Sequence, residues 1–477
     1  MKLLFCLLTA LLVLLTANPP AGAQASAPSV TGDWSGSLQA GKSVLRLVFH
    51  FTPKADGTLT ATVDSLDQGA LGIPFSTARI TGSAVHLDAA GIGAGFDGTL
   101  DASGKIITGH WLQSGNSLPL TLTKTDHAPA MDRPQEPKPP FPYAVQDVTF
   151  PGGAPGVTLA GTLTLPQGVG PFPVTVLISG SGPNDRDETV LGHKPFLLLA
   201  DTLTRRGIAV LRYDKRGVGK STGSYALATS ADFALDAGAA VAYLKTQSAI
   251  DPKRIGLLGH SEGGLIAPLV ASRRPDIAFV VLLAAPGLAG EKILLAQSAL
   301  IGKAEGANTA QIAQDAALQK QLFAIAERET DPVVIQAKAQ AAVLKEVAAL
   351  SPADKAQISD PVSYAKMQSK PISTPWFRFF LAYDPLPALR KTHCPVLALD
   401  GSKDLLVPPA EDLALIEKAS AAGGNTQVTV KELPNLNHLF QTCETGSPSE
   451  YAKITETMAP IVLTTISDWI AAQTGTK

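Results

Sequence analysis

The pentapeptide Gly259-His-Ser-Glu-Gly263 follows a short apolar run and precedes a segment with helical character. In a Gly-x-Ser-x-Gly pattern the two glycines remove side chains that would collide in a sharp strand-to-helix turn, which leaves the serine hydroxyl exposed above a sheet. Ser261 is therefore the candidate nucleophile. The pattern alone also fits an ordinary glycine-rich turn, so the rest of the chain must supply the partners that a serine nucleophile requires.

The first partner is a histidine that takes the proton of the serine, and where the serine stands on a Gly-x-Ser-x-Gly turn the chain order is serine, acid, histidine. Two histidines follow Ser261, His393 and His438. His393 precedes a predicted strand and would lie at the opposite end of the sheet from the serine. His438 follows the last predicted strand at its carboxyl end, where such sites form. We therefore predict that His438 is the base.

The second partner is a carboxylate that holds the histidine. Asp400 and Asp404 both follow the predicted strand 396–399. Asp404 lies in the loop beyond Gly401, which gives it the reach toward His438. We predict that Asp404 is the acid and that Asp400 caps the turn.

An acyl-transfer site also needs two N–H groups for the oxyanion of the tetrahedral intermediate. One is the N–H of Glu262, at a helix start where the helix dipole favours negative charge. The other is assigned to Ser181, in the glycine-rich loop 179–182 that follows a predicted strand. We expect the side chain of Glu262 to matter less than its N–H, and we expect residues 186–188 to form local ion pairs rather than substrate contacts.

These motifs, together with Tyr213-Asp-Lys-Arg-Gly-Val-Gly-Lys-Ser221, Gly401-Ser-Lys-Asp404 and Asn437-His438, resemble the α/β-hydrolase superfamily. The resemblance is closest to secreted bacterial esterases of the serine-aminopeptidase or dienelactone-hydrolase-like type and covers about residues 145–475. It implies the fold and a Ser-Asp-His triad, but not the substrate. In this family the 213–221 loop shapes the floor of the site, and it lacks the helix start of a phosphate-binding loop. One departure is Ser179, which stands where many members have histidine.

The order of predicted elements agrees with this fold class. Residues 144–285 and 393–477 alternate apolar strands with helices, which predicts a mostly parallel sheet with helices on both faces. Residues 286–392 interrupt the alternation with Ala-, Gln- and Lys-rich helical sequence, and we predict a lid that excludes water from the site. The most apolar part of the lid either lines the acyl or alcohol pocket or forms lid core; its aromatic residues are Trp376, Phe377, Phe380 and Tyr383.

The front of the chain has a different pattern. Residues 30–125 alternate apolar and polar side chains between frequent turns, which predicts about eight strands in a small all-β barrel or sandwich. Its tryptophans, Trp34 and Trp111, are expected to fill the core rather than line a ligand pocket. Residues 126–143 are proline-rich and predict a semi-rigid linker. This β-rich segment resembles one that is often joined to such hydrolases, and this resemblance implies no known activity.

Residues 1–23 combine Lys2, a short apolar run and small residues before the expected cleavage point, as in a secretory signal peptide. We therefore expect a secreted or periplasmic protein. The apolar run is too short to span a bilayer comfortably, and no other stretch reaches about 18 apolar residues, so no stable membrane insertion is expected. Cys394 and Cys443 would lie at opposite ends of neighbouring strands, so a disulfide between them is not expected.

Composition bounds the partners. The chain has 477 residues, 45% of them hydrophobic and 17% charged, with a net charge of −2. This balance, without a basic run, argues against nucleic acid and favours a neutral small molecule. No metal-ligand cluster is evident, and no cofactor is expected. The sequence leaves the oligomeric state open.

These observations together predict a carboxylic ester hydrolase that works through an acyl-enzyme. Two alternatives stay open. A peptidase with the same triad would need a lid carboxylate for the ammonium group of its substrate, and Glu327 and Glu329 are candidates that nothing distinguishes. A binding protein would use the front barrel for its ligand, with hydrolysis as a secondary activity. Coenzyme A thioesters are not expected outside the cytoplasm.

Overall fold

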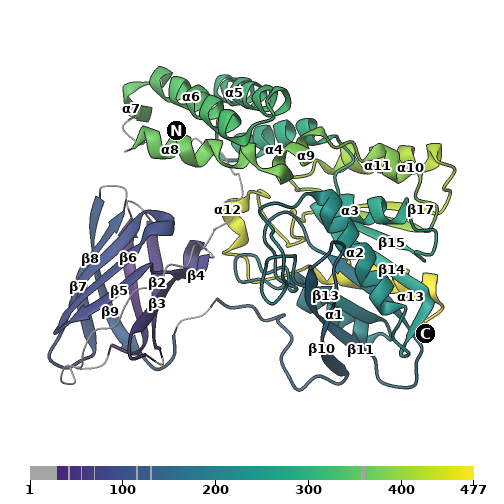
Figure 1. Cartoon of the computed structure of the whole chain (residues 1–477), viewed down its shortest axis with the longest axis horizontal. Coiled ribbons are helices and arrows are strands. Elements are labelled where there is room, and N and C mark those ends of the chain that lie inside the picture. The colour runs from purple at the N-terminus through teal and green to yellow at the C-terminus, as the bar shows by residue number, and fades with distance from the viewer. Residues whose placement is uncertain are drawn as a thin grey trace. The chain divides into compact units, whose positions relative to one another are not determined.

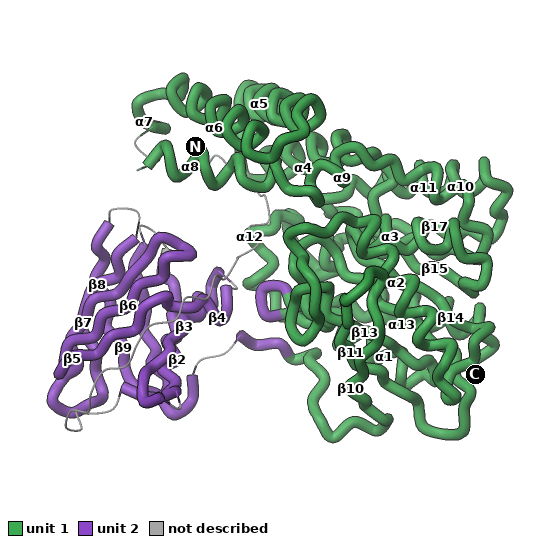
Figure 2. The backbone as a smooth tube through the Cα atoms, viewed as in Figure 1, with its two compact units in different colours: residues 1–9, 134–189, 193–477 green, residues 10–133, 190–192 purple. Residues whose placement is uncertain are grey.

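A computed structural model describes residues 30–40, 43–54, 56–68, 70–113, 116–128, 131–355, 358 and 360–476. The signal peptide predicted for residues 1–23 lies outside these residues. The described chain divides into two compact units, which are coloured separately in Figure 2. The larger unit contains residues 134–189 and 193–476, and the smaller unit contains the described residues up to 133 together with 190–192.

The smaller unit is all-β, as predicted, and its strands form one antiparallel sheet in the order β4-β3-β2-β1-β9-β8-β7-β6-β5. The aromatic side chains of Trp34, Phe49, Phe96 and Trp111 fill its interior and are buried. Both tryptophans thus belong to the core, as expected. The strands are β1 (Gly32–Ala40), β2 (Ser43–Pro53), β3 (Leu59–Ser65), β4 (Ala70–Pro74), β5 (Thr77–Thr81), β6 (Ala84–Ala89), β7 (Ala94–Leu100), β8 (Ile106–Gln113) and β9 (Asn116–Thr125).

The larger unit is built on a mixed sheet with the order β10-β11-β13-β12-β14-β15-β16-β17. The pairs formed by β10 with β11 and by β11 with β13 are antiparallel, and the remaining neighbours are parallel. The central strands are buried on both faces, which explains their continuous apolar sequence. The strands are β10 (Ala144–Pro151), β11 (Thr158–Leu165), β12 (Phe172–Ile178), β13 (Ala209–Tyr213), β14 (Ile250–His260), β15 (Val280–Leu283), β16 (Val396–Gly401) and β17 (Val428–Leu433).

Helices cover both faces of this sheet, as the predicted fold class requires (Figure 1). Helices α2 (Ser230–Leu244), α3 (Glu262–Ala271) and α11 (Pro409–Ala422) contribute to the core on one face. Helices α1 (Pro195–Arg205) and α13 (Pro460–Thr474) contribute to the core on the other. The short helices α10 (Leu386–Arg390) and α12 (Pro448–Tyr451) precede β16 and α13.

The inserted segment between β15 and β16 is helical and lies together on one side of the sheet (Figure 1). It has its own apolar core, which includes Leu322, Phe323, Ile335 and Phe377. Side-chain caps fix where its helices begin: Asn308 and Gln311 form a capping box at α5. Its helices are α4 (Gly290–Ala304), α5 (Thr309–Arg328), α6 (Pro332–Ala349), α7 (Pro352–Lys355), α8 (Pro361–Ser369) and α9 (Pro375–Ala382).

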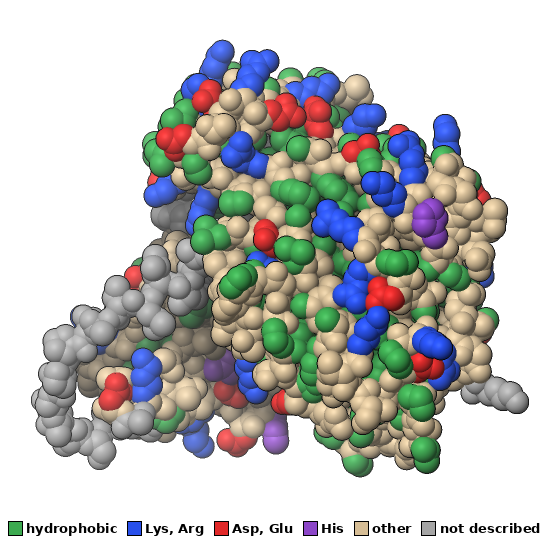
Figure 3. Space-filling model, turned by 45° about the vertical axis from the view of Figure 1, so that its right-hand side comes forward, with side chains coloured by type: hydrophobic (Ala, Val, Ile, Leu, Met, Phe, Trp, Pro, Cys, Tyr) green, Lys and Arg blue, Asp and Glu red, His purple; other side chains and the backbone are tan. Residues whose placement is uncertain are grey.

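The surface carries charges of both signs, and the two described cysteines are not bridged. On the face drawn in Figure 3, lysine and arginine side chains are interspersed with acidic and apolar ones. Cys394 and Cys443 are both free thiols, in accord with the expectation of no disulfide. Within the described ranges, none of the helices is long and apolar enough to cross a membrane.

Candidate active site

Ser261, the predicted nucleophile, lies in the turn between β14 and α3. Its backbone has φ 53° and ψ −118°, a conformation that is costly for a residue with a side chain. Its N–H donates to the carbonyl of Leu283 at 2.9 Å, which fixes the turn to the neighbouring strand. A Cβ at Gly259 would overlap the backbone of Gly263, and a Cβ at Gly263 would overlap the carbonyl of Ile178. Both motif glycines are therefore required by close backbone packing.

His438 and Asp404, the predicted base and acid, are directly joined. The Nδ1 atom of His438 lies 2.6 Å from Oδ2 of Asp404, and both side chains are buried. The other carboxylate oxygen, Oδ1, accepts the N–H groups of Leu406 at 2.7 Å and Val407 at 2.9 Å. These two backbone donors fix the orientation of the carboxylate, so Oδ2 is the atom that faces the imidazole.

The nucleophile turn and the loop of His438 lie side by side. His260, the residue before Ser261, has its Nε2 atom 3.0 Å from the carbonyl of His438. The two imidazole ring centroids are 5.0 Å apart. The Ser261 hydroxyl makes no hydrogen bond within the described part of the chain. The structure therefore joins acid to base, and the base loop to the serine turn, without a bond between serine and histidine; such bonds are often long before substrate binds.

Asp400, the alternative acid, makes no hydrogen bond to His438 among the described residues. Its Oδ1 atom accepts the N–H of Gly401 at 2.7 Å, and within the described residues its buried Oδ2 atom has no hydrogen-bond partner. Burial, together with the nearby Asp404 carboxylate, raises the pKa of Asp400 well above its ordinary value. Asp400 thus caps the strand end through the N–H of Gly401.

The predicted oxyanion loop, residues 179–182, follows β12 and lies against the turn of Ser261, the nucleophile turn. A Cβ at Gly180 would come within 3.2 Å of the Cβ of Ser261. The N–H of Gly180 is occupied, since it donates to Oε1 of Glu188 at 2.5 Å. In the described part of the chain, the N–H groups of Ser181 and Glu262, the two predicted oxyanion donors, have no hydrogen-bond acceptor. They are therefore available to a ligand.

The side chain of Glu262 is fully buried in a polar cluster. Its Oε2 atom pairs with Nζ of Lys215 at 3.1 Å, and its Oε1 atom accepts Ser230 Oγ and Trp376 Nε1, each at 2.6 Å. This side chain links α3 to the 213–221 loop, to α2 and to α9 of the lid, so it has a structural role in addition to the role predicted for its N–H. The sequence indicates such contacts because Glu262 stands among Gly259, Gly263 and Gly264, and a carboxylate buried in such a stretch requires polar partners.

The 213–221 loop is structural, as the resemblance implies. Lys215 is buried and donates to the carbonyl of Gly180 at 2.5 Å, and its Nζ atom lies 4.6 Å from the ring centroid of Phe233. Lys215 therefore stabilises the predicted oxyanion loop by a hydrogen bond to a backbone carbonyl, and its ammonium group is engaged with protein.

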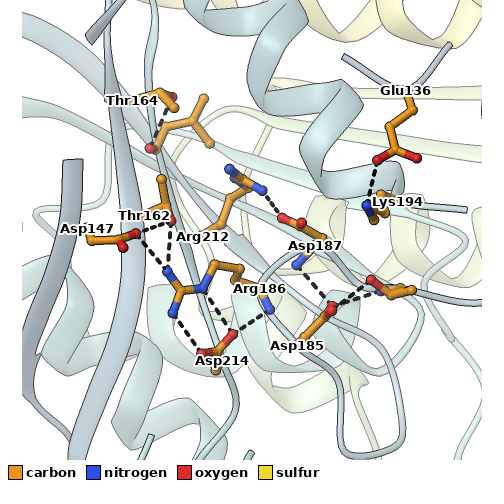
Figure 4. A network of polar contacts seen from close by, with 12 residues as sticks. Glu136, Asp147, Thr162, Thr164, Asp185, Arg186, Asp187, Lys194, Arg212 and Asp214 are labelled. Carbon is orange, nitrogen blue, oxygen red and sulfur yellow. Dashed lines mark hydrogen bonds and ion pairs between the residues drawn. The ribbon is translucent and has the colours of Figure 1, made fainter. Parts of the chain in front are cut away.

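The expected local ion pairs beside the oxyanion loop are present (Figure 4). Arg186 donates from Nη2 to Asp214 at 2.8 Å and from Nη1 to Thr162 at 2.8 Å. Arg212 pairs with Asp187. These pairs anchor the far end of the loop to the edge of the sheet, which leaves Arg186 and Asp187 engaged with protein rather than with substrate.

The four aromatic residues predicted for the pocket divide into two groups. Trp376 and Phe380 stack with ring centroids 5.3 Å apart. Phe380 packs with Leu265 of α3 and with Val407, which precedes α11, and Tyr383 lies next to this cluster. Phe377 instead belongs to the lid core, where its ring lies 5.9 Å from that of Phe323. The seam between lid and sheet is thus formed by three of the four predicted residues. Burial raises the pKa of Tyr383 to about 12.

Two residues of this region were not singled out as site residues by the sequence. Glu188 and His260 are buried between the oxyanion loop and the loop of His438, and His260 Nδ1 lies 3.0 Å from Glu188 Oε1. His260 occupies a variable position of the motif, which carries no signal of its own. No group of three His, Cys, Asp or Glu side chains that would hold a metal ion occurs among the described residues.

Comparisons with known proteins found a matching family, a curated relative and similar solved structures. A family model described as serine aminopeptidase, S33, matches residues 194–442. The esterase EstD of Thermotoga maritima is 29% identical over 315 residues, which cover 66% of this chain and 64% of that protein. The chain therefore spans somewhat less than two thirds of this relative. Among solved structures, the match to the esterase Pf2001 of Pyrococcus furiosus covers 70% of this chain and 94% of the esterase chain, with 18% identity and a TM-score of 0.41.

Proposed function

Because the chain belongs to the serine aminopeptidase S33 family and is an α/β-hydrolase, we propose that it cleaves carboxylic esters through an acyl-enzyme on Ser261. The observation that carries the proposal is the buried pair of Asp404 and His438, which lies beside the strained turn of Ser261. A relative that is named an esterase, EstD, supports the choice of ester over other acyl substrates.

The proposed reaction gives each group a defined role. Asp404 accepts a hydrogen bond from Nδ1–H of His438, which keeps the proton of the neutral ring on Nδ1 and leaves Nε2 with a free lone pair. Nε2 takes the hydroxyl proton of Ser261 while Oγ attacks the ester carbonyl, and the N–H groups of Ser181 and Glu262 receive the oxyanion. The tetrahedral intermediate then expels the alcohol, which leaves with the proton from Nε2. A water molecule, deprotonated by His438, releases the acid by the same two steps.

The peptidase alternative is less well supported. It needs a free carboxylate near Ser261 for the ammonium group of a peptide. Glu262 is fully engaged with Lys215, Ser230 and Trp376, and Glu188 is bound to the oxyanion loop. Of the two lid candidates, Glu327 is exposed and Glu329 pairs with Lys338. These contacts favour a neutral ester over a substrate with a free amino terminus.

The binding-protein alternative is weakened by the interior of the β-unit, which is occupied by the buried rings of Trp34, Phe49, Phe96 and Trp111. We also propose export of the chain by residues 1–23, on the strength of their sequence alone. Determining the amino terminus of the protein recovered from the periplasm or the medium tests this. A chain that still begins at Met1 in the cytoplasm contradicts it.

The decisive experiment combines labelling with kinetics. A fluorophosphonate probe should label the wild-type protein, and mass spectrometry of the digested adduct should place it on Ser261. S261A should lose the label and lower the hydrolysis of short p-nitrophenyl esters by roughly 10⁶-fold. Ordinary hydrolysis by S261A refutes the assignment. Faster cleavage of aminoacyl amides than of simple esters favours the peptidase instead.

A further inference from the structure

Glu188 and His260 form a buried polar pair that the proposed reaction does not use. Oε1 of Glu188 accepts the N–H of Gly180 at 2.5 Å and lies 3.0 Å from Nδ1 of His260. On the other side of the ring, Nε2 of His260 lies 3.0 Å from the carbonyl of His438. The pair therefore contacts the oxyanion loop, the nucleophile turn and the loop of the predicted base at once.

The chemistry of these contacts fixes a proton. A backbone carbonyl only accepts hydrogen bonds, and so does an ionised carboxylate, whereas a neutral imidazole has one donor and one acceptor nitrogen. Both contacts of His260 are satisfied only if both ring nitrogens carry hydrogen, or if the proton of Nδ1 resides on Glu188. In either arrangement Glu188 and His260 together hold one additional proton, and the buried pair is neutral overall.

The electrostatics agree with this count. Burial lowers the pKa of His260, but the charge of Glu188 and the hydrogen bonds to Glu188 and His438 outweigh it and raise the pKa above the ordinary value. The Oε2 atom of Glu188 is buried without a hydrogen-bond partner among the described residues, so its hold on both neighbours rests on Oε1.

The backbone also indicates a constrained position. Glu188 has a φ of 52°, in the left-handed region that costs free energy for a residue with a side chain. Such a conformation persists where surrounding contacts determine it. Here these contacts are the Gly180 N–H and the ring of His260.

We propose that Glu188 and His260 are a positioning pair, which sets the distance between the oxyanion donors and His438 through one side chain from each of two loops. Neither residue touches the substrate. The proposal rests on the proposed ester hydrolysis, since it concerns the alignment of that same site. A displacement of reacting groups by about 1 Å lowers the rate by about 100-fold, so loss of either contact should be measurable.

Two substitutions at position 260 separate the two contacts. In H260N the amide nitrogen replaces Nδ1 and keeps the contact with Glu188, while the contact with the His438 carbonyl is lost. In H260Q the amide nitrogen replaces Nε2 and keeps only the contact with His438. Each variant, and E188Q, should lower kcat for a short p-nitrophenyl ester by about 10- to 100-fold, with KM changed less than about threefold.

The pH dependence supplies a readout that a merely structural role would not move. The charges of Glu188 and Asp404 act on His260, together with its hydrogen bond to the backbone carbonyl of His438. H260N removes the ring that shares the additional proton with Glu188 and leaves a negative carboxylate, which favours a protonated His438 and should move the acid limb of kcat/KM to higher pH. E188Q removes the carboxylate, so the additional proton on His260 is no longer compensated and should move this limb to lower pH. Shifts of opposite sign support the pairing, and a common shift contradicts it.

H50Q is the matched control, because His50 of the β-unit also contacts two acceptors, Asp33 at 2.7 Å and Asp64 at 3.1 Å. It should keep the wild-type kcat. Wild-type kcat in H260N, H260Q and E188Q, with S261A inactive, overturns the positioning pair alone. Activity in S261A overturns the proposed function instead. If a His260 variant fails to fold, E188Q and the labelling rate of its folded fraction decide the question.

Discussion

Asparagine in place of Asp404 should abolish most of the activity without a change of shape. The Oδ1 atom of Asp404 accepts two backbone N–H groups, from Leu406 and Val407. Only an oxygen accepts these bonds, so the amide oxygen of the D404N side chain must take the place of Oδ1. The amide nitrogen then takes the place of Oδ2, 2.6 Å from Nδ1 of His438.

The consequence is a reversed tautomer. An amide nitrogen donates, so Nδ1 of His438 must accept, and the single proton of the neutral ring moves to Nε2. Nε2 then has no lone pair for the serine proton. Loss of the correct tautomer costs about 10⁴-fold in kcat, or about 5.5 kcal/mol of transition-state stabilisation.

The assay is kcat/KM for a short p-nitrophenyl ester at pH 8, with the melting temperature measured in the same buffer. The matched control is D400N. The Oδ1 atom of Asp400 accepts the N–H of Gly401, and the oxygen of an amide reproduces this contact. D400N should therefore keep activity within about threefold. A loss below tenfold in D404N refutes the tautomer argument, and a large loss in D400N alone assigns the acid to Asp400.

Three further predictions concern the lid and the pH dependence of stability. W376F removes the 2.6 Å hydrogen bond to the buried Glu262 carboxylate and should weaken lid docking by about 1.5–3 kcal/mol, seen as faster hydrogen exchange in α9; unchanged exchange contradicts this. Burial raises the pKa of Asp412 to about 7, above its unfolded value, so its contribution to stability is lost as the pH rises through 7. D412N should therefore be more stable relative to wild type at pH 8.5 than at pH 5.5, and an equal difference in melting temperature at both pH values refutes this. Burial lowers the pKa of His50, but Asp33 and Asp64 raise it above the ordinary value, so the β-unit should lose stability as the pH rises through this raised pKa, whereas H50Q should show no such loss; a flat wild-type profile contradicts it.

The fold was predictable because its signals are local. The alternation of apolar strands with helices sets the parallel sheet, and the turns that interrupt period-two segments set the all-β unit. Gly259 and Gly263 predict a turn because no side chain fits at either position. Gly259 packs against the backbone of Gly263, and Gly263 packs against the carbonyl of Ile178. The placement of Asp404 and His438 after neighbouring strands followed from the rule that carboxyl ends of parallel strands meet at one edge.

The polar network below the site was not predictable in the same way. Glu188 and His260 are 72 residues apart, and His260 and His438 are 178 apart. A buried charge shows no periodicity, and its partner is chosen by packing between distant loops. The sequence marks such residues only indirectly, as charged side chains within otherwise apolar or glycine-rich stretches.

The aromatic residues of α9 show a signal that was present but unused. Trp376 and Phe380 are four residues apart and therefore share one helix face, while Phe377 lies about 100° around the helix from Trp376. The structure agrees with this spacing. Trp376 and Phe380 stack at the seam between the lid and the sheet, and Phe377 packs with Phe323 in the lid core. Because Trp376 and Phe380 pack at this seam, the helix cannot leave it without exposing two aromatic rings and breaking the bond between Trp376 and Glu262. Movement of the lid is thus coupled to the residue that follows the nucleophile.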